Sequence, residues 1–221
     1  MLILAFDAST PTVTVALARE QGGNREVLAE AAATVGGASE VLLPAVHAVL
    51  GFAGERLENV ELILVGVGPG TFTGIRIAAS TARALSQGTG AALAKNSTLA
   101  ALTAPALPTQ PEVLAVIDAK RGQVFAQRFS GARAGDMMCL KPEKLVAEDW
   151  PLLVGDGAVR YREDLSVIGE IPPDGSPLHR VTAAGHVLSA DLKPVEPEEL
   201  VPLYIREPDA EVRRDLNPWS R

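Results

Sequence analysis

Two segments decide the fold: Ile3-Leu4-Ala5-Phe6-Asp7-Ala8 near the start of the chain, and Val113-Leu114-Ala115-Val116-Ile117-Asp118-Ala119 in its middle. Each is a short apolar run that meets an aspartate, which predicts a strand buried inside a sheet. A second strand follows each of them after a short turn, over 12–18 and 123–129. Two copies of one plan predict an α/β protein built from a duplicated unit.

The rest of the chain fills in this plan. Further strands are expected over 26–34, 62–67, 91–94 and 152–154. Helices are expected over 39–52 with Ser39 as the N-cap, over 75–87, from Ser97 or Thr98, and over 181–190. The stretch 103–111 contains three prolines and has the composition of a linker. We therefore predict two subdomains, 1–105 and 106–221.

Composition limits the function classes. Of the 221 residues 47% are hydrophobic and 21% charged, as in ordinary globular proteins, and the formal net charge is −7. That charge argues against a dedicated nucleic-acid binder, whose affinity comes largely from Lys and Arg. Cys139 is the only cysteine, which fits a reducing compartment. The N-terminus does not resemble a signal peptide, and no apolar run reaches the ~20 residues that span a bilayer. We expect a cytoplasmic protein that does not enter a membrane.

A glycine-rich loop, Gly68-Pro69-Gly70-Thr71-Phe72-Thr73-Gly74, joins the strand over 62–67 to the next helix. Such loops are typical of anion sites, because unpaired backbone N–H groups at the start of the helix face the ligand. The loop lacks the Lys-Ser or Lys-Thr of a P-loop, and its glycine spacing differs from the dinucleotide fingerprint. An anion loop and a tight turn that packs the helix on the sheet remain equally good interpretations.

Few residues suggest catalysis. The histidines are His47, His179 and His186, and no two of them are spaced for one helical face, so no metal site is expected. Asp7 and Asp118 are candidate carboxylates at strand ends, where α/β folds commonly bind ligands, but aspartates there also serve as turn residues. The next two residues after Ala119, Lys120 and Arg121, can hold a phosphate, although a solvated turn is the simpler interpretation.

Four segments resemble the TsaB (YeaZ) family. The loop 68–77 is similar to its Gly-Pro-Gly-Ser-Phe-Thr-Gly-Leu-Arg signature, and 3–10 to its Ile-Leu-x-Ile-Asp-Thr-Ser-Thr start. The segment 117–125 resembles Asp-Ala-Arg-Arg-Gly-Glu-Val-Tyr, and 201–206, which includes Tyr204 and Arg206, resembles Pro-x-Tyr-Leu-Arg. The resemblance implies an actin-like (ASKHA) duplicated fold of two ribonuclease-H-like subdomains. It also implies a role in making threonylcarbamoyladenosine beside the anticodon of tRNAs.

The resemblance further implies a partner without catalytic activity. In that system a TsaD-type paralogue transfers the group with a metal held by a His-x-x-x-His pair, and a TsaE-type protein is an ATPase. Thr98 and Leu102 stand where the two histidines would be, and a hydroxyl with an isobutyl group cannot bind that metal. We therefore expect an inactive paralogue with no cofactor and no metal, which meets tRNA only through the complex. The residues assigned to vestigial nucleotide or phosphate loops are Asp7, Ser9, Gly68, Gly70, Thr71 and Thr73.

Two helices are expected to bind the partner, a TsaD-type protein or a second copy of this chain. The helix over 39–52 is apolar nearly all round, and that over 75–87 pairs a polar stripe with a small apolar body, so both need cover on several sides. The residues expected to contact the partner are Leu42, Leu43, Val46, Val49, Leu50, Ile75, Arg76, Ala79 and Arg83.

Two enzyme functions remain as alternatives. A sugar- or acetate-kinase-like enzyme would share the duplicated fold and use aspartates at these strand ends with ATP. The chain is short for such kinases and lacks a clear second phosphate loop. A peptidase would need a nucleophile–base pair or a metal site, and the sequence offers no such pattern.

Overall fold

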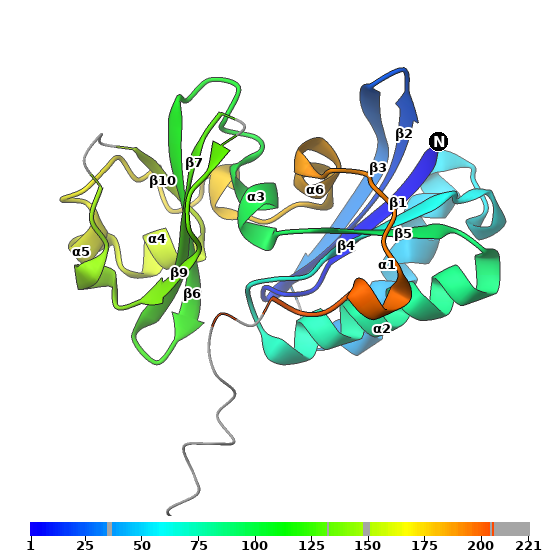
Figure 1. Ribbon diagram of the computed structural model, residues 1–221, viewed down its shortest axis with the longest axis horizontal. Coiled ribbons are helices and arrows are strands. Elements are labelled where there is room, and N and C mark those ends of the chain that lie inside the picture. The colour runs from blue at the N-terminus through cyan, green and yellow to red at the C-terminus, as the bar shows by residue number, and fades with distance from the viewer. Residues whose placement is uncertain (35–36, 132, 148–150, 204, 206–221) are drawn as a thin grey trace, which may run out of the picture.

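The computed structural model describes residues 1–34, 37–131, 133–147, 151–203 and 205, which form two halves side by side (Figure 1). The sheet of the N-terminal half has the order β3-β2-β1-β4-β5. Its strands are β1 (Leu2–Asp7), β2 (Thr12–Gln21), β3 (Asn24–Thr34), β4 (Leu62–Gly66) and β5 (Ala92–Asn96). The sheet of the C-terminal half has the order β10-β6-β7-β8, and β9 pairs with β7. Its strands are β6 (Glu112–Lys120), β7 (Gln123–Ser130), β8 (Arg133–Ala134), β9 (Met138–Leu140) and β10 (Leu152–Val154).

The two sheets repeat one pairing pattern, which confirms the predicted duplication. In the first sheet β1 pairs antiparallel with β2 and parallel with β4. In the second, β6 pairs antiparallel with β7 and parallel with β10. Asp7 and Asp118 consequently occupy corresponding places near the carboxyl ends of β1 and β6.

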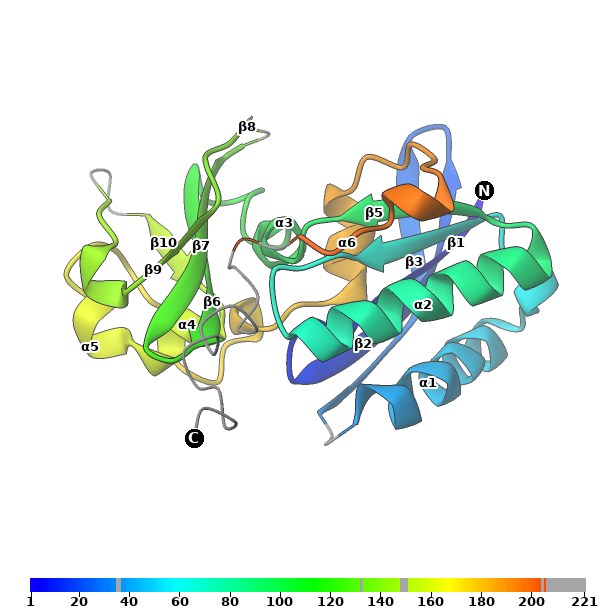
Figure 2. The same cartoon turned by 60° about the horizontal axis from the view of Figure 1, so that its bottom comes forward.

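Helices cover both faces of the N-terminal sheet. The helices α1 (Ala38–Ala53) and α2 (Phe72–Thr89) lie side by side on one face, and α6 (Ala183–Ser189) packs on the other (Figure 2). Leu4 and Phe6 of β1 face the core under α1 and α2, whereas Ile3 and Ala5 face the core under α6. Because both faces are covered, β1 is apolar without a break until Asp7.

The C-terminal half is covered by shorter helices. One core holds α3 (Thr98–Thr103), and the opposite core holds residues of α4 (Asp156–Arg160) and α5 (Arg162–Leu165). Single turns of 3-10 helix occur at η1 (Leu57–Asn59), η2 (Pro142–Lys144), η3 (Pro177–His179) and η4 (Pro197–Glu199).

The packing crosses the subdomain boundary predicted between residues 105 and 106. The helix α3 belongs to the first segment but packs in the core of the second half, and α6 belongs to the second segment but packs on the first sheet. The two helices contact each other, and a Cβ atom at Gly185 of α6 would collide with the carbonyl oxygen of Ala101 in α3. A single cut in the chain therefore does not separate two independent cores.

The segment after α6 returns along the N-terminal half. The N–H of Val195 donates to the carbonyl of Leu93 in β5, and Arg83 donates to the carbonyls of Pro197 and Leu200. Leu200 is fully buried. This segment shields the edge strand β5, where unpaired backbone groups would otherwise be exposed. Tyr204 and Arg206 of the C-terminal motif lie outside the described residues.

Some element boundaries differ from the predictions. The helix α1 begins at Ala38 with Gly37 as its N-cap, so Ser39 lies inside the first turn rather than capping it. The helix α2 begins at Phe72, three residues before the predicted start, because Thr71 already has extended backbone and serves as the N-cap. Within the described part of the chain, the helices are too short or too polar to cross a lipid bilayer.

Candidate functional site

Asp7 lies at the centre of a buried polar cluster where β1, α3 and α6 meet. Its Oδ2 atom lies 2.8 Å from Nε2 of His186 and 2.7 Å from Oγ1 of Thr98, and its Oδ1 atom accepts from the N–H of Ser9. Thr98 donates its hydrogen to Asp7, so Oγ of Ser9 donates to Oγ1 of Thr98 at 2.9 Å. Asp7, Thr98 and His186 are fully buried and Ser9 nearly so. The carboxylate is thus satisfied from three directions within the protein.

The hydrogen bonds on the far side of His186 define its tautomer. Ser189 donates its hydroxyl hydrogen to the carbonyl of Gly185 at 2.8 Å, so its oxygen accepts from Nδ2 of Asn96 at 2.7 Å. The same amide group lies 3.3 Å from Nδ1 of His186, which must then accept. The ring therefore carries its proton on Nε2 and donates it to Asp7.

The surroundings of Asp7 favour its ionised form. Burial by itself raises the pKa of the Asp7 carboxyl, but the hydrogen bonds from His186 and Ser9 outweigh it. The pKa of Asp7 therefore lies below its ordinary value, and the buried carboxylate holds α6 to β1.

Three glycines let the glycine-rich segment pack closely on the end of β1. A Cβ atom at Gly66 would collide with the Asp7 carboxylate, at Gly70 with the carbonyl of Ser9, and at Gly74 with the carbonyl of Ala8. The N–H of Thr71 donates to the carbonyl of Ser9 at 2.6 Å. The loop residues therefore contact the turn after β1. Gly68 is buried, whereas Thr71 and Thr73 are exposed.

Asp118, the counterpart of Asp7, has a different environment. Its side chain is 3% exposed, and it accepts from the N–H and Nζ of Lys120, both at 2.9 Å. Nη1 of Arg160 lies 3.5 Å from its Oδ2 atom. Burial by itself raises the pKa of Asp118, but the hydrogen bonds and charges of Lys120 and Arg160 lower it further than burial raises it. Asp118 is thus an ionised anchor beneath two exposed cations.

Asp156 begins α4 and lies beside Asp118. Its Oδ1 atom accepts from the N–H of Asp118 at 3.0 Å. Burial and the negative charge of Asp118 raise the pKa of Asp156, and its backbone hydrogen bonds and the charge of Lys120 offset only part of that effect. The two neighbouring carboxyls therefore have pKa values shifted in opposite directions.

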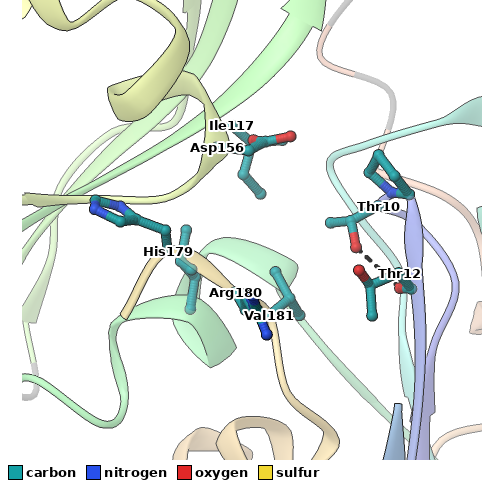
Figure 3. A pocket seen from close by; sticks show the side chains of 9 residues that line it. Thr10, Thr12, Ile117, Asp156, His179, Arg180 and Val181 are labelled. Atoms are coloured by element: carbon teal, nitrogen blue, oxygen red, sulfur yellow. Dashed lines mark hydrogen bonds between the residues drawn. The ribbon is translucent and has the colours of Figure 1, made fainter. Parts of the chain in front are cut away.

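A cavity of about 160 Å³ lies between the halves (Figure 3). Thr10 and Thr12 face it from the N-terminal half, and Asp156 and His179 from the C-terminal half. Both ring nitrogens of His179 are engaged, because Nδ1 accepts from the N–H of Gly155 and Nε2 donates to a backbone carbonyl. Ligand sites for drug-sized molecules occupy about 300–1,000 Å³, so this cavity is small for a nucleotide.

Comparisons with known proteins give one answer. Residues 35–151 match the family model described as "TsaD: tRNA N6-adenosine threonylcarbamoyltransferase". A Mycobacterium tuberculosis protein named as uncharacterized is 32% identical over 94% of this chain and 93% of its own length. The Escherichia coli protein named tRNA threonylcarbamoyladenosine biosynthesis protein TsaB is 29% identical over 93% of this chain and 95% of its own length. The solved structure of YeaZ from Pseudomonas aeruginosa superimposes with a TM-score of 0.75 at 27% identity, covering 92% of this chain and 99% of that one.

The chain belongs to the TsaB (YeaZ) family. The predicted fold class is confirmed, because two α/β halves with matching sheets and the similarity to YeaZ agree with the duplicated actin-like fold. A second Pseudomonas aeruginosa structure, described as similar to the peptidase YeaZ, has a TM-score of 0.77 at 29% identity and covers 93% of this chain and 99% of that one.

Thr98 and Leu102, where the transferase would have its metal-binding histidines, have structural roles in this TsaB-family chain. The hydroxyl of Thr98 bonds to Asp7 and Ser9. Leu102 is 1% exposed, belongs to the core of the second half and lines the cavity. Neither side chain offers an imidazole, so the residues present do not fit the transferase metal. Among the described residues, no three His, Cys, Asp or Glu side chains are grouped as metal ligands.

The structure corrects the choice of partner-binding residues. Six of the nine face the interior of this chain and are at most 7% exposed: Leu42, Val46, Val49, Leu50, Ile75 and Ala79. They bury the inner faces of the two helices, so a partner cannot reach them. Leu43, Arg76 and Arg83 are exposed, but Arg83 already holds the segment after α6. Whether a partner covers these helices stays a prediction.

Sequence reasoning missed His186, Asn96 and Asp156. A single histidine in a short helix far from Asp7 carries no pattern that separates it from an ordinary core residue. Asn96 precedes a helix and resembles a loop residue. A sequence pattern could have pointed to Asp156. The residue lies in the turn directly after a short strand, and Asp7 and Asp118 likewise stand at the ends of strands.

Proposed function

We propose that this chain is a partner subunit, without catalytic activity of its own, of the complex that forms threonylcarbamoyladenosine beside the anticodon of tRNAs. In this role it binds and supports a TsaD-type transferase together with a TsaE-type ATPase. Membership of the TsaB family and the name of the E. coli relative support the process. The role as a partner subunit goes beyond the family name, and it rests on the geometry of the buried cluster around Asp7.

The observation that carries the proposal is the closed state of Asp7. Its oxygens accept from Ser9, Thr98 and His186, and all four side chains are buried. In a phosphate-transferring relative of this fold the corresponding aspartate would have to face the substrate cleft. Here the carboxylate instead stabilises the junction between β1, α3 and α6, which suits a structural subunit better than a kinase-like enzyme.

The outer faces of α1 and α2 are the proposed docking surface. Leu43 is 52% exposed and Phe52 80% on α1, and Phe72 is 44% exposed at the start of α2. The two helices lie side by side on one face of the molecule (Figure 2). Leu43 and Phe52 flank the buried side of α1, and large exposed apolar side chains of this kind mark candidate protein-binding surfaces. We call Leu43, Phe52 and Phe72 the helix surface.

Co-purification with a TsaD-type transferase from the same genome tests this surface. The double variant Leu43→Glu/Phe52→Glu puts two carboxylates where a bound partner would exclude water. Because buried charges disfavour association, the variant should no longer co-elute with the transferase. Val167→Glu is the matched control, because Val167 is 72% exposed in the other half. It should bind like the parent.

Light scattering on the chain alone distinguishes the two candidate occupants of the helix surface, which are the transferase and a second copy of this chain. A dimer that the double variant dissociates would show that a second copy uses the same surface. Unchanged co-elution of the double variant would place the docking site elsewhere.

A further inference from the structure

We propose that one end of the second sheet binds the phosphate backbone of RNA. The surface consists of Lys120, Arg121, Lys141 and Arg160, here called the basic corner. The inference rests on the proposed function, because it assigns to this chain a direct contact with the tRNA of that complex.

The turn between β6 and β7 puts two cations in an unfavourable backbone conformation. Lys120 has φ 64° and Arg121 φ 54°, followed by Gly122 at 73°. Side chains other than Gly, Asn and Asp seldom adopt positive φ, and adjacent cases are rarer still. Two-residue hairpin turns with positive φ at both central positions favour Asn-Gly, whereas this turn has Arg121-Gly122. Such strain is concentrated at functional sites, so the cations call for a functional explanation.

A buried carboxylate fixes the cations beside the turn. Asp118 is 3% exposed, whereas the side chains of Lys120 and Arg160 are 59% and 61% exposed. The carboxylate therefore lies beneath the surface and holds both cationic groups at its edge. Lys120 and Arg160 compensate the buried charge of Asp118, and this arrangement keeps both cationic groups at the surface. It presents positive charge outward with less freedom than unsupported side chains would have.

The sheet register brings a fourth cation to the same end. In the antiparallel pair of β7 and β9, Leu140 lies opposite Val124, the second residue of β7 after the turn. Lys141 follows Leu140 directly and therefore lies beside the turn. Lys141 is exposed, with Nζ 3.6 Å from Oε1 of the exposed Glu143. Asp118 contacts Lys120 and Arg160, Asp156 lies beside Asp118, and Glu143 lies near Lys141. The exposed Glu163 and Asp164 follow Arg160 by three and four residues. A chain with net charge −7 has gathered four cations at one end of one sheet.

Phosphate is the group that this arrangement fits. Arg offers a planar fork of N–H donors and Lys a point charge, and both are the usual partners of backbone phosphates. The basic corner contains no exposed aromatic or aliphatic anchor of the kind that dominates protein interfaces. It also lies in the opposite half from α1 and α2 (Figure 1), so it is separate from the helix surface.

The test measures tRNA binding by the complex of this chain with its TsaD-type transferase, across a salt series. The key variant is Arg121→Asn, which removes the charge and supplies the residue that the turn prefers, so it should fold at least as well as the parent. Arg160→Gln removes a second cation. Each loss should weaken tRNA binding about four- to fivefold at 0.15 M salt, and each should reduce the slope of log K against log salt by about 0.7–0.9. Arg121→Lys should retain most of the affinity.

The matched control is Arg56→Gln, since Arg56 is 79% exposed in the N-terminal half. It should bind tRNA like the parent. If Arg121→Asn/Arg160→Gln binds tRNA with the parent's affinity and salt slope, the proposal is wrong. If that variant instead separates from the transferase, the corner binds protein and the proposal is equally wrong. If the parent chain itself does not form the complex with the transferase, the proposed function is wrong. That result is distinct from the two outcomes for the double variant.

Discussion

Nε2 of His186 lies 2.8 Å from Oδ2 of Asp7, although 179 residues separate the two in the sequence. The bond joins a late helix to the first strand of the chain, and both side chains are fully buried. The N-terminal half is therefore complete only after α6 has packed on it. This relationship makes the stability of the first half depend on residues near the other end of the chain.

Replacing His186 by alanine should destabilise the protein strongly. Asp7 would lose one of its buried donors and α6 its tie to β1, and a hydrogen bond to a charged group contributes about 1.5–3 kcal/mol. Urea unfolding at pH 7 measures the effect. His47→Ala is the control, because His47 is exposed on α1 and its loss should change stability by less than about 0.5 kcal/mol. Equal stabilities of the two variants would show that the buried pair contributes nothing.

The variant Asp7→Asn should lose stability in a pH-dependent way. Because the pKa of Asp7 is lower in the folded protein, its contribution is fully present above the ordinary value of 3.8 and is lost as the pH falls through the folded value. The difference in unfolding free energy between parent and variant should therefore be large at pH 6–7 and shrink below pH 3.8. A difference that stays constant down to pH 3 would contradict this account of the carboxylate.

Asp156→Asn should behave in the opposite way. Burial and the charge of Asp118 raise the pKa of Asp156, so the parent loses stability as the pH rises from 3.8 through the folded value. Asparagine removes that penalty and keeps an oxygen that can accept from the N–H of Asp118. The variant should match the parent near pH 3.5 and be more stable than the parent at pH 7. Lower stability at pH 7 would mean that the ionised form is favoured in the folded protein.

Two glycines of α2 should respond to alanine with opposite signs. At Gly74 the added methyl group would collide with the carbonyl of Ala8, so Gly74→Ala should destabilise by about 1–3 kcal/mol. At Gly88 no atom lies within 4 Å of the added group, and Gly88→Ala should stabilise by about 0.5–1 kcal/mol. Thermal unfolding of both variants checks the pair. A stable Gly74→Ala variant would show that the loop does not need to approach β1 closely.

The duplicated fold could be predicted because its signal is local. The runs before Asp7 and Asp118 are apolar without interruption, since sheets covered on both faces need such strands. The buried cluster could not be predicted, because Asp7, Thr98 and His186 come together only through the packing of α3 and α6. Six of the nine residues expected to contact a partner are buried in this chain, and the sequence could not show this for a related reason. In an apolar helix such as α1 the sequence does not say which side the sheet covers, and Leu42 and Leu43 differ only in the direction they point.

Leu42 and Leu43 therefore provide a direct comparison of core and surface. Leu42 is 1% exposed, so Leu42→Ala should cost about 2–5 kcal/mol of unfolding free energy. Leu43 is 52% exposed, so Leu43→Ala should leave stability within about 0.5 kcal/mol and weaken association with the transferase by about 1–3 kcal/mol. Calorimetry of binding and of unfolding measures both quantities. An association unaffected by Leu43→Ala would remove α1 from the docking surface.

Formation of threonylcarbamoyladenosine in a reconstituted system tests the central proposal most directly. The purified chain is combined with its TsaD-type transferase, the TsaE-type ATPase, an activated threonylcarbamoyl donor and unmodified tRNA, and each protein is left out in turn. The account predicts that the modified nucleoside accumulates only when this chain and the transferase are both present, and that this chain alone forms none. Modification by this chain without the transferase, or full modification by the transferase without this chain, would contradict the account.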